Sequence, residues 1–282
     1  MSVVLVTGGN TGIGLETCVA LAGQGHHLVF TSRDATRGES ARREIVGRSS
    51  SESVDVMALD LACFASVREF AGAFLDRYDT LDVLIHNAGV VLSSRQVTED
   101  GNEATFQVNH LGPFLLDALL RGRVAESGDA RVVVVASAAH TSARHGLDFD
   151  DLQTERRRYS SFAVYGRTKL ANILFTRELS RRLAGTDATA NAVHPGFVAT
   201  RFARDGDTGI LGTMLMPLLR PFALSPTQGA QTSIYVATAP ELEGITGGYW
   251  AKCAPATPSA SAQDDDAARR LWEVSEQLTG LA

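Results

Sequence analysis

The sequence has few cysteines, and their spacing excludes two common ways of stabilising a chain. Only three occur among its 282 residues, Cys18, Cys63 and Cys253, and they lie far apart. A disulfide framework needs a denser, even-numbered set, and a structural zinc site needs close pairs of cysteine or histidine. We therefore predict buried thiols in a reducing compartment, no metal ion and a cytoplasmic location.

Long apolar runs and an excess of positive charge are also missing. No stretch offers about twenty consecutive apolar residues, and the closest, Ile210–Leu224, is interrupted by Pro217, Arg220 and Pro221. The chain begins on the apolar run Val3–Val6 without a charged leader. Its formal net charge is −6, so no basic face dominates. We expect no transmembrane segment, no signal peptide and no nucleic acid partner.

The remaining composition is that of an ordinary globular protein. Hydrophobic residues make up 44% of the chain and charged residues 21%, a balance that favours a soluble fold with a packed core. A chain of this length buries such a core without disulfides or metals. No repeat or internal linker is visible, so we predict a single domain over residues 1–282.

Short apolar runs alternate with helix-prone segments along most of the chain. The predicted strands cover residues 3–6, 27–31, 54–59, 81–86, 131–136 and 189–193, with a last short one at 247–250. The run at 131–136 is nearly continuous in valine, which is typical of a strand covered on both faces. The alternation predicts an α/β fold: a Rossmann-type, doubly wound parallel sheet in a three-layer αβα arrangement.

The first predicted strand ends in a glycine-rich turn. Gly8, Gly12 and Gly14 follow the spacing Gly-x-x-x-Gly-x-Gly, and a helix-prone stretch begins at Leu15. Such glycines let the backbone approach a pyrophosphate, and the helix N-terminus offers N–H donors and a positive dipole end. A tight strand–helix turn without a ligand is the alternative. The strand before the turn favours the dinucleotide interpretation.

The end of the second predicted strand carries the choice between NAD and NADP. An acidic residue there binds the ribose 2′-hydroxyl in many NAD sites, whereas an arginine accommodates a 2′-phosphate. Arg33 occupies that place, and Arg37 adds a second positive charge one turn later. Asp34 can bind a ribose or cap the helix that follows. Arg33 favours NADP(H) over NAD(H).

Three further polar residues stand where a ligand or a local structural role would explain them. Asp60 ends the third strand, where it can bind an adenine amino group or serve as N-cap of a helix from about Ala65. Ser137 ends the fifth strand, where its hydroxyl can bind a substrate oxygen or cap a turn. Asn109 interrupts a largely apolar helical run, and either a functional side chain or a bend near Pro113 explains it.

Tyr165 and Lys169 lie four residues apart in a segment predicted to be helical, at about residues 163–183. Residues at i and i+4 share one face of a helix. A lysine beside a tyrosine favours the phenolate and so lowers the pKa of the phenol. A phenol tuned in this way can act as a general acid or base. By itself the pair also fits a solvated helix face, and the surrounding motifs decide between the two.

Two segments near the C-terminus complete the predicted organisation. Residues 199–224 mix glycines, prolines and bulky apolar side chains. They are expected to form a lid over the substrate, or a surface patch for a second copy of the chain. The tail, at about 259–282, is expected to end in a helix.

These motifs, in this order and spacing, resemble the short-chain dehydrogenase/reductase family over nearly the whole chain. They are Thr7-Gly8-x-x-x-Gly12-x-Gly14, Asp60, Asn87-Ala88-Gly89, Asn109, Ser137, Tyr165-x-x-x-Lys169 and Pro195-Gly196. Residues 31–34, 169–172 and 271–275 look most like the retinol-dehydrogenase-like branch, as does the long insertion before Tyr165. That branch prefers NADP(H). Its animal members often carry an apolar N-terminal anchor that is absent here, which argues against a membrane location and against retinoids as substrates.

The resemblance implies a role for each matching residue. Tyr165 would exchange a proton with the substrate oxygen, Lys169 would lower its pKa and hold the nicotinamide ribose, Ser137 would bind that oxygen, and Asn109 would position a water. The residues implied around the cofactor are Gly8, Asn10, Thr11, Gly12, Ile13 and Gly14 at the pyrophosphate, Arg33 at the 2′-phosphate, Asp60 and Leu61 at the adenine, Asn87, Ala88 and Gly89 at the adenosine ribose, and Pro195, Gly196 and Val198 at the nicotinamide.

The implied function is an NADP(H)-dependent oxidoreductase that interconverts a carbonyl compound and an alcohol. The apolar residues of 210–224 favour a lipophilic small-molecule substrate. Two alternatives use the same fold: a non-catalytic NADP(H)-binding regulator, and an epimerase or dehydratase. The chain after the sixth strand is short for the larger substrate domain of the latter, and a pure binder has no need of Asn109, Ser137, Tyr165 and Lys169 together.

Overall fold

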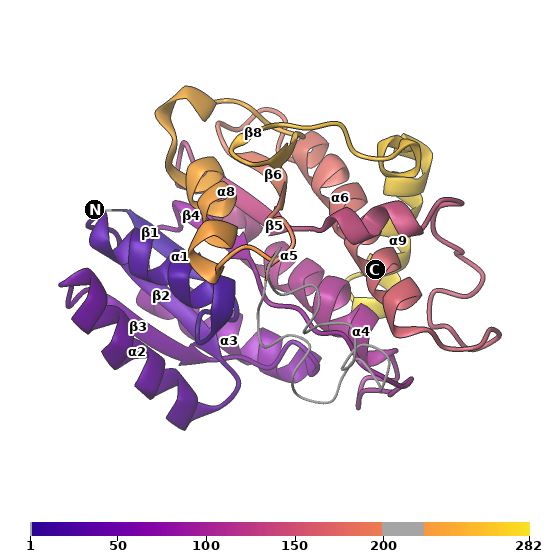
Figure 1. Cartoon of the computed structure of the whole chain (residues 1–282), viewed down its shortest axis with the longest axis horizontal. Coiled ribbons are helices and arrows are strands. Elements are labelled where there is room, and N and C mark those ends of the chain that lie inside the picture. Colours follow the sequence, from indigo (N-terminus) through magenta and orange to yellow (C-terminus); the bar gives the residue numbers. More distant parts are fainter. Residues whose placement is uncertain (1, 199–222) are drawn as a thin grey trace.

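The architecture is a single mixed sheet between two layers of helices (Figure 1). The structure is a computed structural model, and it describes residues 2–198 and 223–282. Its strands are β1 (Val3–Val6), β2 (His27–Ser32), β3 (Val54–Ala58), β4 (Val83–His86), β5 (Arg131–Val135), β6 (Thr189–His194), β7 (Tyr249–Ala251) and β8 (Ala254–Pro255). They lie in the order β3-β2-β1-β4-β5-β6-β7-β8. All pairs are parallel except β7–β8, which is antiparallel. The doubly wound α/β prediction is confirmed.

The sheet reverses its winding between β1 and β4. The chain moves outward from β1 to β3 and then returns to place β4 beside β1, with Leu5 level with Leu84. In open α/β sheets a ligand crevice forms at this kind of switch point, beyond the carboxyl ends of the strands. Topology alone therefore places the candidate site at one edge of the molecule.

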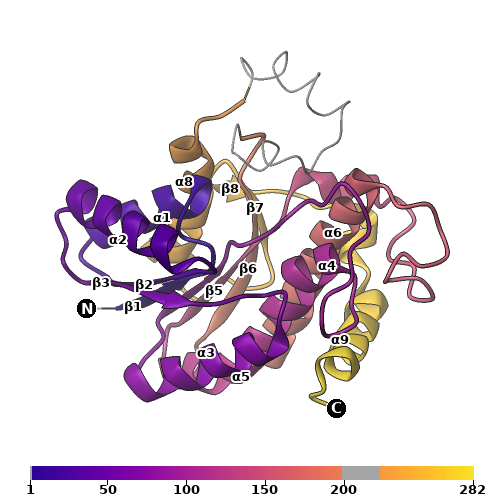
Figure 2. The same cartoon turned by 90° about the horizontal axis from the view of Figure 1, so that it is seen from below.

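Helices cover both faces of the sheet (Figure 2). One layer contains α1 (Gly12–Gly23), α2 (Ala35–Ser49) and α8 (Pro226–Thr238), and the other contains α3 (Phe64–Arg77), α5 (Gly112–Glu126) and α6 (Ser161–Arg182). Alternate strand residues point into the two layers. Leu5 and Leu84 join the core beneath α3, α5 and α6, whereas Val6 and Ile85 join the one beneath α1, α2 and α8. Burial on both faces explains the valine- and leucine-rich strands.

The long helix expected through residues 106–120 is interrupted. A short helix α4 (Ala104–Phe106) continues into a π-helical turn, Gln107–Leu111, before α5 starts at Gly112. Asn109 lies at the centre of that turn. Insertions of this kind are often found at functional sites. The expected irregularity near Asn109 is therefore present, and it is a π-helical turn that ends just before Pro113.

Three further local features differ from the sequence prediction or lie outside the residues that the structure describes. Strand β8 was not expected, because a two-residue edge strand leaves no periodic pattern in the sequence. Asp60 does not cap α3, whose N-cap is Cys63; its carboxylate accepts the N–H of Ala62 instead, at 2.9 Å. Most of the expected lid or oligomer patch, residues 199–222, lies outside the described residues.

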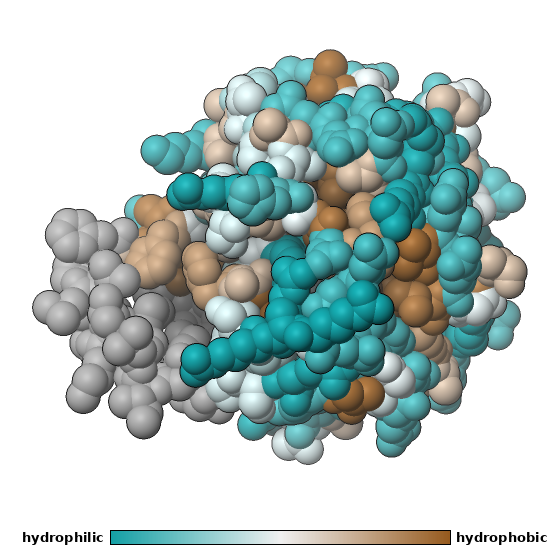
Figure 3. All heavy atoms as spheres, turned by 90° about the vertical axis from the view of Figure 1, so that its right-hand side faces the viewer, coloured by the Kyte–Doolittle hydropathy of each residue, from teal (hydrophilic) through white to brown (hydrophobic). Residues whose placement is uncertain are grey.

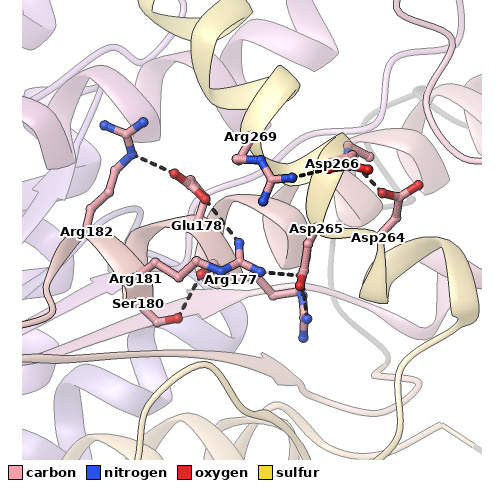
Figure 4. Close-up of polar contacts among 10 residues, drawn as sticks. Arg177, Glu178, Ser180, Arg181, Arg182, Asp264, Asp265, Asp266 and Arg269 are labelled. Carbon is pink, nitrogen blue, oxygen red and sulfur yellow. Dashed lines mark hydrogen bonds and ion pairs between the residues drawn. The ribbon is translucent and has the colours of Figure 1, made fainter.

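The C-terminal helix α9 (Asp265–Thr279) packs against α5 and α6. Trp272 is buried there, and the guanidinium groups of Arg121 and Arg182 lie 4.7 and 4.2 Å from its ring centroid. Asp265 pairs with Arg177 and Arg181, while Glu178 pairs with Arg181 and Arg182 (Figure 4). The tail, expected at about 259–282 to end in a helix, contains α9, preceded by a 3₁₀ turn at Ala260–Gln263.

The face on the α9 side is mostly hydrophilic, with apolar side chains showing as smaller patches (Figure 3). Among the helices of residues 2–198 and 223–282, none has the length and hydropathy needed to cross a membrane. The same ranges contain no cluster of three or more His, Cys, Asp or Glu side chains suited to holding a metal ion.

Candidate active site

A cleft of about 1810 Å³ lies along the carboxyl ends of β1 to β6. Eighteen of the nineteen predicted site residues line it. They are Gly8, Asn10, Thr11, Gly12, Ile13, Gly14, Arg33, Asp60, Leu61, Asn87, Ala88, Gly89, Ser137, Tyr165, Lys169, Pro195, Gly196 and Val198. The exception is Asn109, which is fully buried behind the cleft wall. Residues spread over most of the sequence therefore converge on one crevice.

The glycine-rich turn is built so that only glycine fits. Gly8 and Gly12 have φ angles of +66° and +58°, a region that side chains rarely adopt. At Gly14 a Cβ atom would lie 2.3 Å from the Gly8 carbonyl oxygen and 2.5 Å from the Asn87 amide nitrogen. The turn is thus folded tightly onto the end of β4, with its backbone exposed to the cleft.

Thr7 and Asn87 fasten that turn to β4. The Thr7 hydroxyl oxygen accepts the N–H groups of Asn87 and Ala88 at 3.0 and 3.1 Å. In return, the Asn87 side chain donates to the carbonyls of Thr7 and Gly8 at 2.9 and 3.1 Å. The amide of Asn87 therefore shapes the glycine turn, while the segment that follows it faces the cleft.

The N-terminus of α1 has the features of an anion-binding site. Thr11 occupies the N-cap position but makes no side-chain capping bond, and the first turn has no acidic residue. Free N–H groups and the positive end of the helix dipole therefore face the cleft. Together with the close approach at Gly14, they fit the pyrophosphate of a dinucleotide.

Positive charge lines the cleft beside the end of β2. Arg33 and Arg37 both line it, and neither side chain has a hydrogen-bond or ion-pair partner among the described residues. Asp34 caps α2 by accepting the N–H of Arg37 at 2.8 Å. Of the two roles considered for Asp34, the structure shows the cap. The unpaired guanidinium of Arg33 stays available for an anionic group.

Asn109 connects three segments behind the cleft. Its side-chain oxygen accepts the Val90 N–H at 2.7 Å, and its amide nitrogen donates to the Val90 carbonyl and to the Thr168 hydroxyl at 2.9 and 3.0 Å. A Cβ atom on Gly89 would lie 3.2 Å from the Asn109 oxygen and 3.6 Å from the Lys169 ammonium. The side chain thus fixes the Gly89–Val90 segment, which follows β4, against α6 and next to Lys169.

Lys169 is buried and holds its ammonium at the end of β5. Only 3% of the residue is exposed, and its Nζ donates to the Val135 carbonyl at 2.8 Å. Asn172 donates to the same carbonyl at 3.2 Å. Burial lowers the pKa of Lys169 to about 8, because an ammonium loses solvation in the interior. This amine therefore titrates close to physiological pH.

Tyr165 and Ser137 meet at the centre of the cleft. Burial raises the pKa of Tyr165 to about 12, and a hydrogen bond with Ser137 opposes that rise. The Lys169 ammonium lies 5.5 Å from the centroid of the Tyr165 ring. Desolvation has the largest influence on the pKa of this phenol, and the lowering expected from Lys169 stays a prediction. Ser137 also accepts the Ala139 N–H at 3.1 Å, so it both caps a turn and contacts Tyr165.

The end of β6 closes the cleft. Gly196 has a φ of +85°, and Val198 forms an isolated bridge with Leu224. His194 accepts the N–H groups of Ala138 and Gly196 on its Nδ1, at 3.2 and 3.3 Å. This histidine therefore joins the turn after Ser137 to the Pro195–Val198 segment.

Three residues that support this site were given no role from the sequence: Thr7, Thr168 and His194. Each acts by holding another group, through contacts across the sheet or between helices. Thr7 offered the one visible signal, a polar residue at the end of an apolar strand. Short spacing motifs do not capture contacts between residues that are distant in the sequence.

Comparisons with known proteins agree on one family. The short chain dehydrogenase family matches residues 2–147. Mouse retinol dehydrogenase 12 is 46% identical over 279 residues, covering 99% of this chain and 86% of the relative. Human retinol dehydrogenase 13 is 42% identical over 283 residues, covering 99% and 84%. Among solved structures, an uncharacterized protein from Mycobacterium paratuberculosis superimposes with a TM-score of 0.79 at 35% identity, covering 99% and 94%.

Proposed function

The chain belongs to the short-chain dehydrogenase/reductase family, in its retinol-dehydrogenase-like branch, and we propose that it interconverts a carbonyl compound and an alcohol with NADP(H). One observation carries the proposal: Ser137, Tyr165 and Lys169 line the same cleft as an uncapped helix N-terminus and its glycine turn. The bound dinucleotide supplies or accepts the hydride. The residues of the chain bind it, orient the substrate and manage one proton.

The proton is handled by Tyr165. With a pKa of about 12 the phenol is protonated at neutral pH, which suits a general acid that protonates the developing alkoxide during reduction. Ser137 contacts the phenol and donates a hydrogen bond to the same substrate oxygen. In the oxidative direction the phenol must first lose its proton, so that direction is favoured at higher pH.

Lys169 and Asn109 support this pair. The Lys169 ammonium, held by the Val135 carbonyl, hydrogen-bonds the nicotinamide ribose and attracts a phenolate at Tyr165. The side-chain oxygen and nitrogen of Asn109 are hydrogen-bonded to Val90 and Thr168. We therefore assign its side chain to positioning the segment beside Lys169 rather than to holding a water.

The preference for NADP(H) rests on the unpaired Arg33 at the end of β2. A guanidinium facing a 2′-phosphate makes charge-assisted hydrogen bonds that a hydroxyl cannot match. Arg33→Glu is expected to lower kcat/KM for NADPH by about ten- to hundredfold, equivalent to about 1.5–3 kcal/mol, and to leave NADH much less affected. Arg43→Glu, on α2 outside the cleft, is the control for the general charge change. Equal losses with both cofactors contradict the assignment.

The substrate side of the cleft combines apolar surface with positive charge. Phe162 and Phe197 line it with 64% and 47% of their surface exposed. Arg144 and Arg158 also line this part, whereas the acidic lining residues of the described cleft all lie on the dinucleotide side. We propose a lipophilic aldehyde or ketone that is neutral or negatively charged. A cationic carbonyl compound is expected to be a poor substrate.

Oxidation of NADPH in the presence of a panel of carbonyl compounds tests the function. Turnover of lipophilic aldehydes or aromatic ketones, at rates above those with small polar ketones, supports it. Tight binding of NADPH without turnover of any compound favours a regulatory protein instead. Release of a rearranged or dehydrated product without net NADPH oxidation favours an epimerase or dehydratase.

A further inference from the structure

The turn that follows Ser137 is held by a buried histidine that the proposed mechanism does not use. His140 is 2% exposed and belongs to the 3₁₀ turn Ala138–Ser142. Its ring lies edge-on to Tyr249 of β7, with centroids 5.4 Å apart. Burial lowers the pKa of His140, so the neutral ring is the form present at physiological pH.

The hydrogen bonds of His140 fix which nitrogen carries its proton. The backbone N–H of Ser259 donates to Nε2 at 3.1 Å, so Nε2 must be the unprotonated nitrogen. Nδ1 then carries the hydrogen and donates it to the Ser137 carbonyl at 2.7 Å. Which nitrogen is protonated in a neutral histidine is commonly set by the bond that the other one makes.

This arrangement ties the residue that contacts Tyr165 to the C-terminal segment. The Ser137 carbonyl also accepts the His140 backbone N–H at 3.1 Å. The other side of the same peptide unit is also held, because the Ala138 N–H donates to His194. The backbone that carries the Ser137 hydroxyl is therefore anchored on both sides, and one anchor depends on a residue 119 positions away.

We propose that His140 is a positioning residue for Ser137, and that the backbone N–H of Ser259 selects the tautomer in which it works. This inference rests on the proposed function, because it gives Ser137 a role at the reacting oxygen. If the Nδ1 donor is lost, the Ser137 carbonyl loses its shortest bond and the hydroxyl is less well aimed. Small displacements of a positioned group reduce turnover more than they reduce binding.

Proline at position 259 removes the selecting N–H and places its Cδ where that hydrogen lies, so Nε2 of His140 can no longer accept a hydrogen bond from position 259. Ser259 has a φ of −59°, which is close to the angle that proline fixes. In Ser259→Pro the His140 ring is expected to lose its preference for the Nδ1–H form, visible in the ¹⁵N signals of its imidazole. kcat is expected to fall about five- to tenfold, the effect of one hydrogen bond of about 1 kcal/mol, with the dissociation constant for NADPH unchanged.

Ser259→Ala is the matched comparison for the tautomer. It keeps the backbone N–H and removes a hydroxyl that is buried without a hydrogen-bond partner among the described residues. The wild-type ¹⁵N pattern of His140 is therefore expected in this variant. An Nε2–H tautomer in the wild-type protein overturns the proposal whether or not the protein turns over carbonyl compounds, which separates its failure from that of the proposed function.

Two substitutions of His140 itself separate positioning from packing. Asparagine places its amide nitrogen near the position of Nδ1, so it can donate to the Ser137 carbonyl. Glutamine instead places its amide group near the position of Nε2, where it can accept the Ser259 N–H but cannot donate to the Ser137 carbonyl. Both remove the ring that packs against Tyr249, so the loss of packing is similar in the two variants. His140→Asn is expected to keep kcat within about threefold of wild type, and His140→Gln to lose about tenfold. Equal losses in both variants, or none in either, overturn the proposal.

Discussion

The two ends of α6 carry charged side chains in opposite circumstances. In the first turns, Tyr165 and Lys169 face the cleft, and the Lys169 ammonium is buried with one short hydrogen bond to a backbone carbonyl. In the last turns, Arg177, Arg181 and Arg182 lie at the surface and pair with Glu178 and Asp265 (Figure 4). The same helix thus holds a buried cation without an ion-pair partner among residues 2–198 and 223–282 at one end, and a network of ion pairs at the other.

The charged groups at the first end of α6 serve function at a cost in stability, whereas those at the second end concern stability alone. A buried ammonium without a carboxylate partner costs free energy, as its lowered pKa indicates. The ion pairs of the exposed Asp265 contribute little, because water and salt screen them. Natural proteins commonly retain such unfavourable groups where function requires them. Changes at the first end should therefore alter turnover strongly, and loss of the Asp265 pairs at the second end should alter only stability, and slightly.

The largest expected effect is at Tyr165. Tyr165→Phe removes the proton donor and keeps the ring, so kcat is expected to fall by about a hundred- to ten-thousandfold. Binding of NADPH, followed by fluorescence titration, is expected to change little. Tyr235→Phe, on α8 outside the cleft, is the control. Turnover close to wild type in Tyr165→Phe contradicts the mechanism.

Lys169→Met should separate activity from stability. Turnover is expected to fall by about a hundredfold or more as the support of the proton-transferring group is lost. The free energy of unfolding at pH 7 is expected to rise by about 1–3 kcal/mol, because a buried charge disappears. The Val135 carbonyl keeps its bond from Asn172. Urea denaturation measures this, with the exposed Lys252→Met as control. A loss of stability at pH 7 contradicts the view that this charge is unfavourable.

The pH dependence of stability tests the same lysine. Its pKa is about 8 in the folded protein and 10.5 in a free side chain. Between these values the unfolded chain binds more protons than the folded one, so the stability of the wild type rises with pH. Urea denaturation from pH 7 to 10.5 should show this rise relative to Lys169→Met. Parallel curves for the two proteins argue against a depressed lysine pKa.

The direction of catalysis should respond to pH through Tyr165. Because burial raises the pKa of this phenol to about 12, reduction is expected to vary little between pH 6 and pH 8. Alcohol oxidation needs the phenolate and should rise up to about tenfold per pH unit below the apparent pKa. Initial rates in both directions with one alcohol–carbonyl pair measure this. Oxidation that is independent of pH contradicts the assignment of Tyr165 as base.

The smallest effect is expected at the other end of α6. Asp265→Asn removes the ion pairs of α9 with Arg177 and Arg181, and should lower the free energy of unfolding by less than about 1 kcal/mol. The loss should shrink in 1 M salt, where charges are screened, and kcat should not change. Asp266→Asn is the matched control, since Asp266 pairs only within α9, with Arg269. A loss of several kcal/mol indicates that the network anchors the tail helix.

Local sequence patterns were sufficient for most of the fold and for the lining of the cleft. Strand–helix alternation predicted the sheet, and the glycine spacing identified the turn at Gly8–Gly14, because both depend on residues close together in the chain. The patterns did not predict that Asn109 lies in a π-helical turn with its side chain bonded to Val90 and Thr168. Nor did they reveal the link from Ser259 through His140 to Ser137.

The first turns of α6 show which properties follow from the sequence and which follow from the tertiary structure. The sequence by itself determined that Tyr165 and Lys169 share one helical face, because the helix repeat fixes the positions of residues four apart. Only the tertiary structure decided their electrostatics. Burial under the sheet edge raises the pKa of the phenol and lowers that of the amine, since desolvation depends on everything packed around a group and not on its neighbours in the chain.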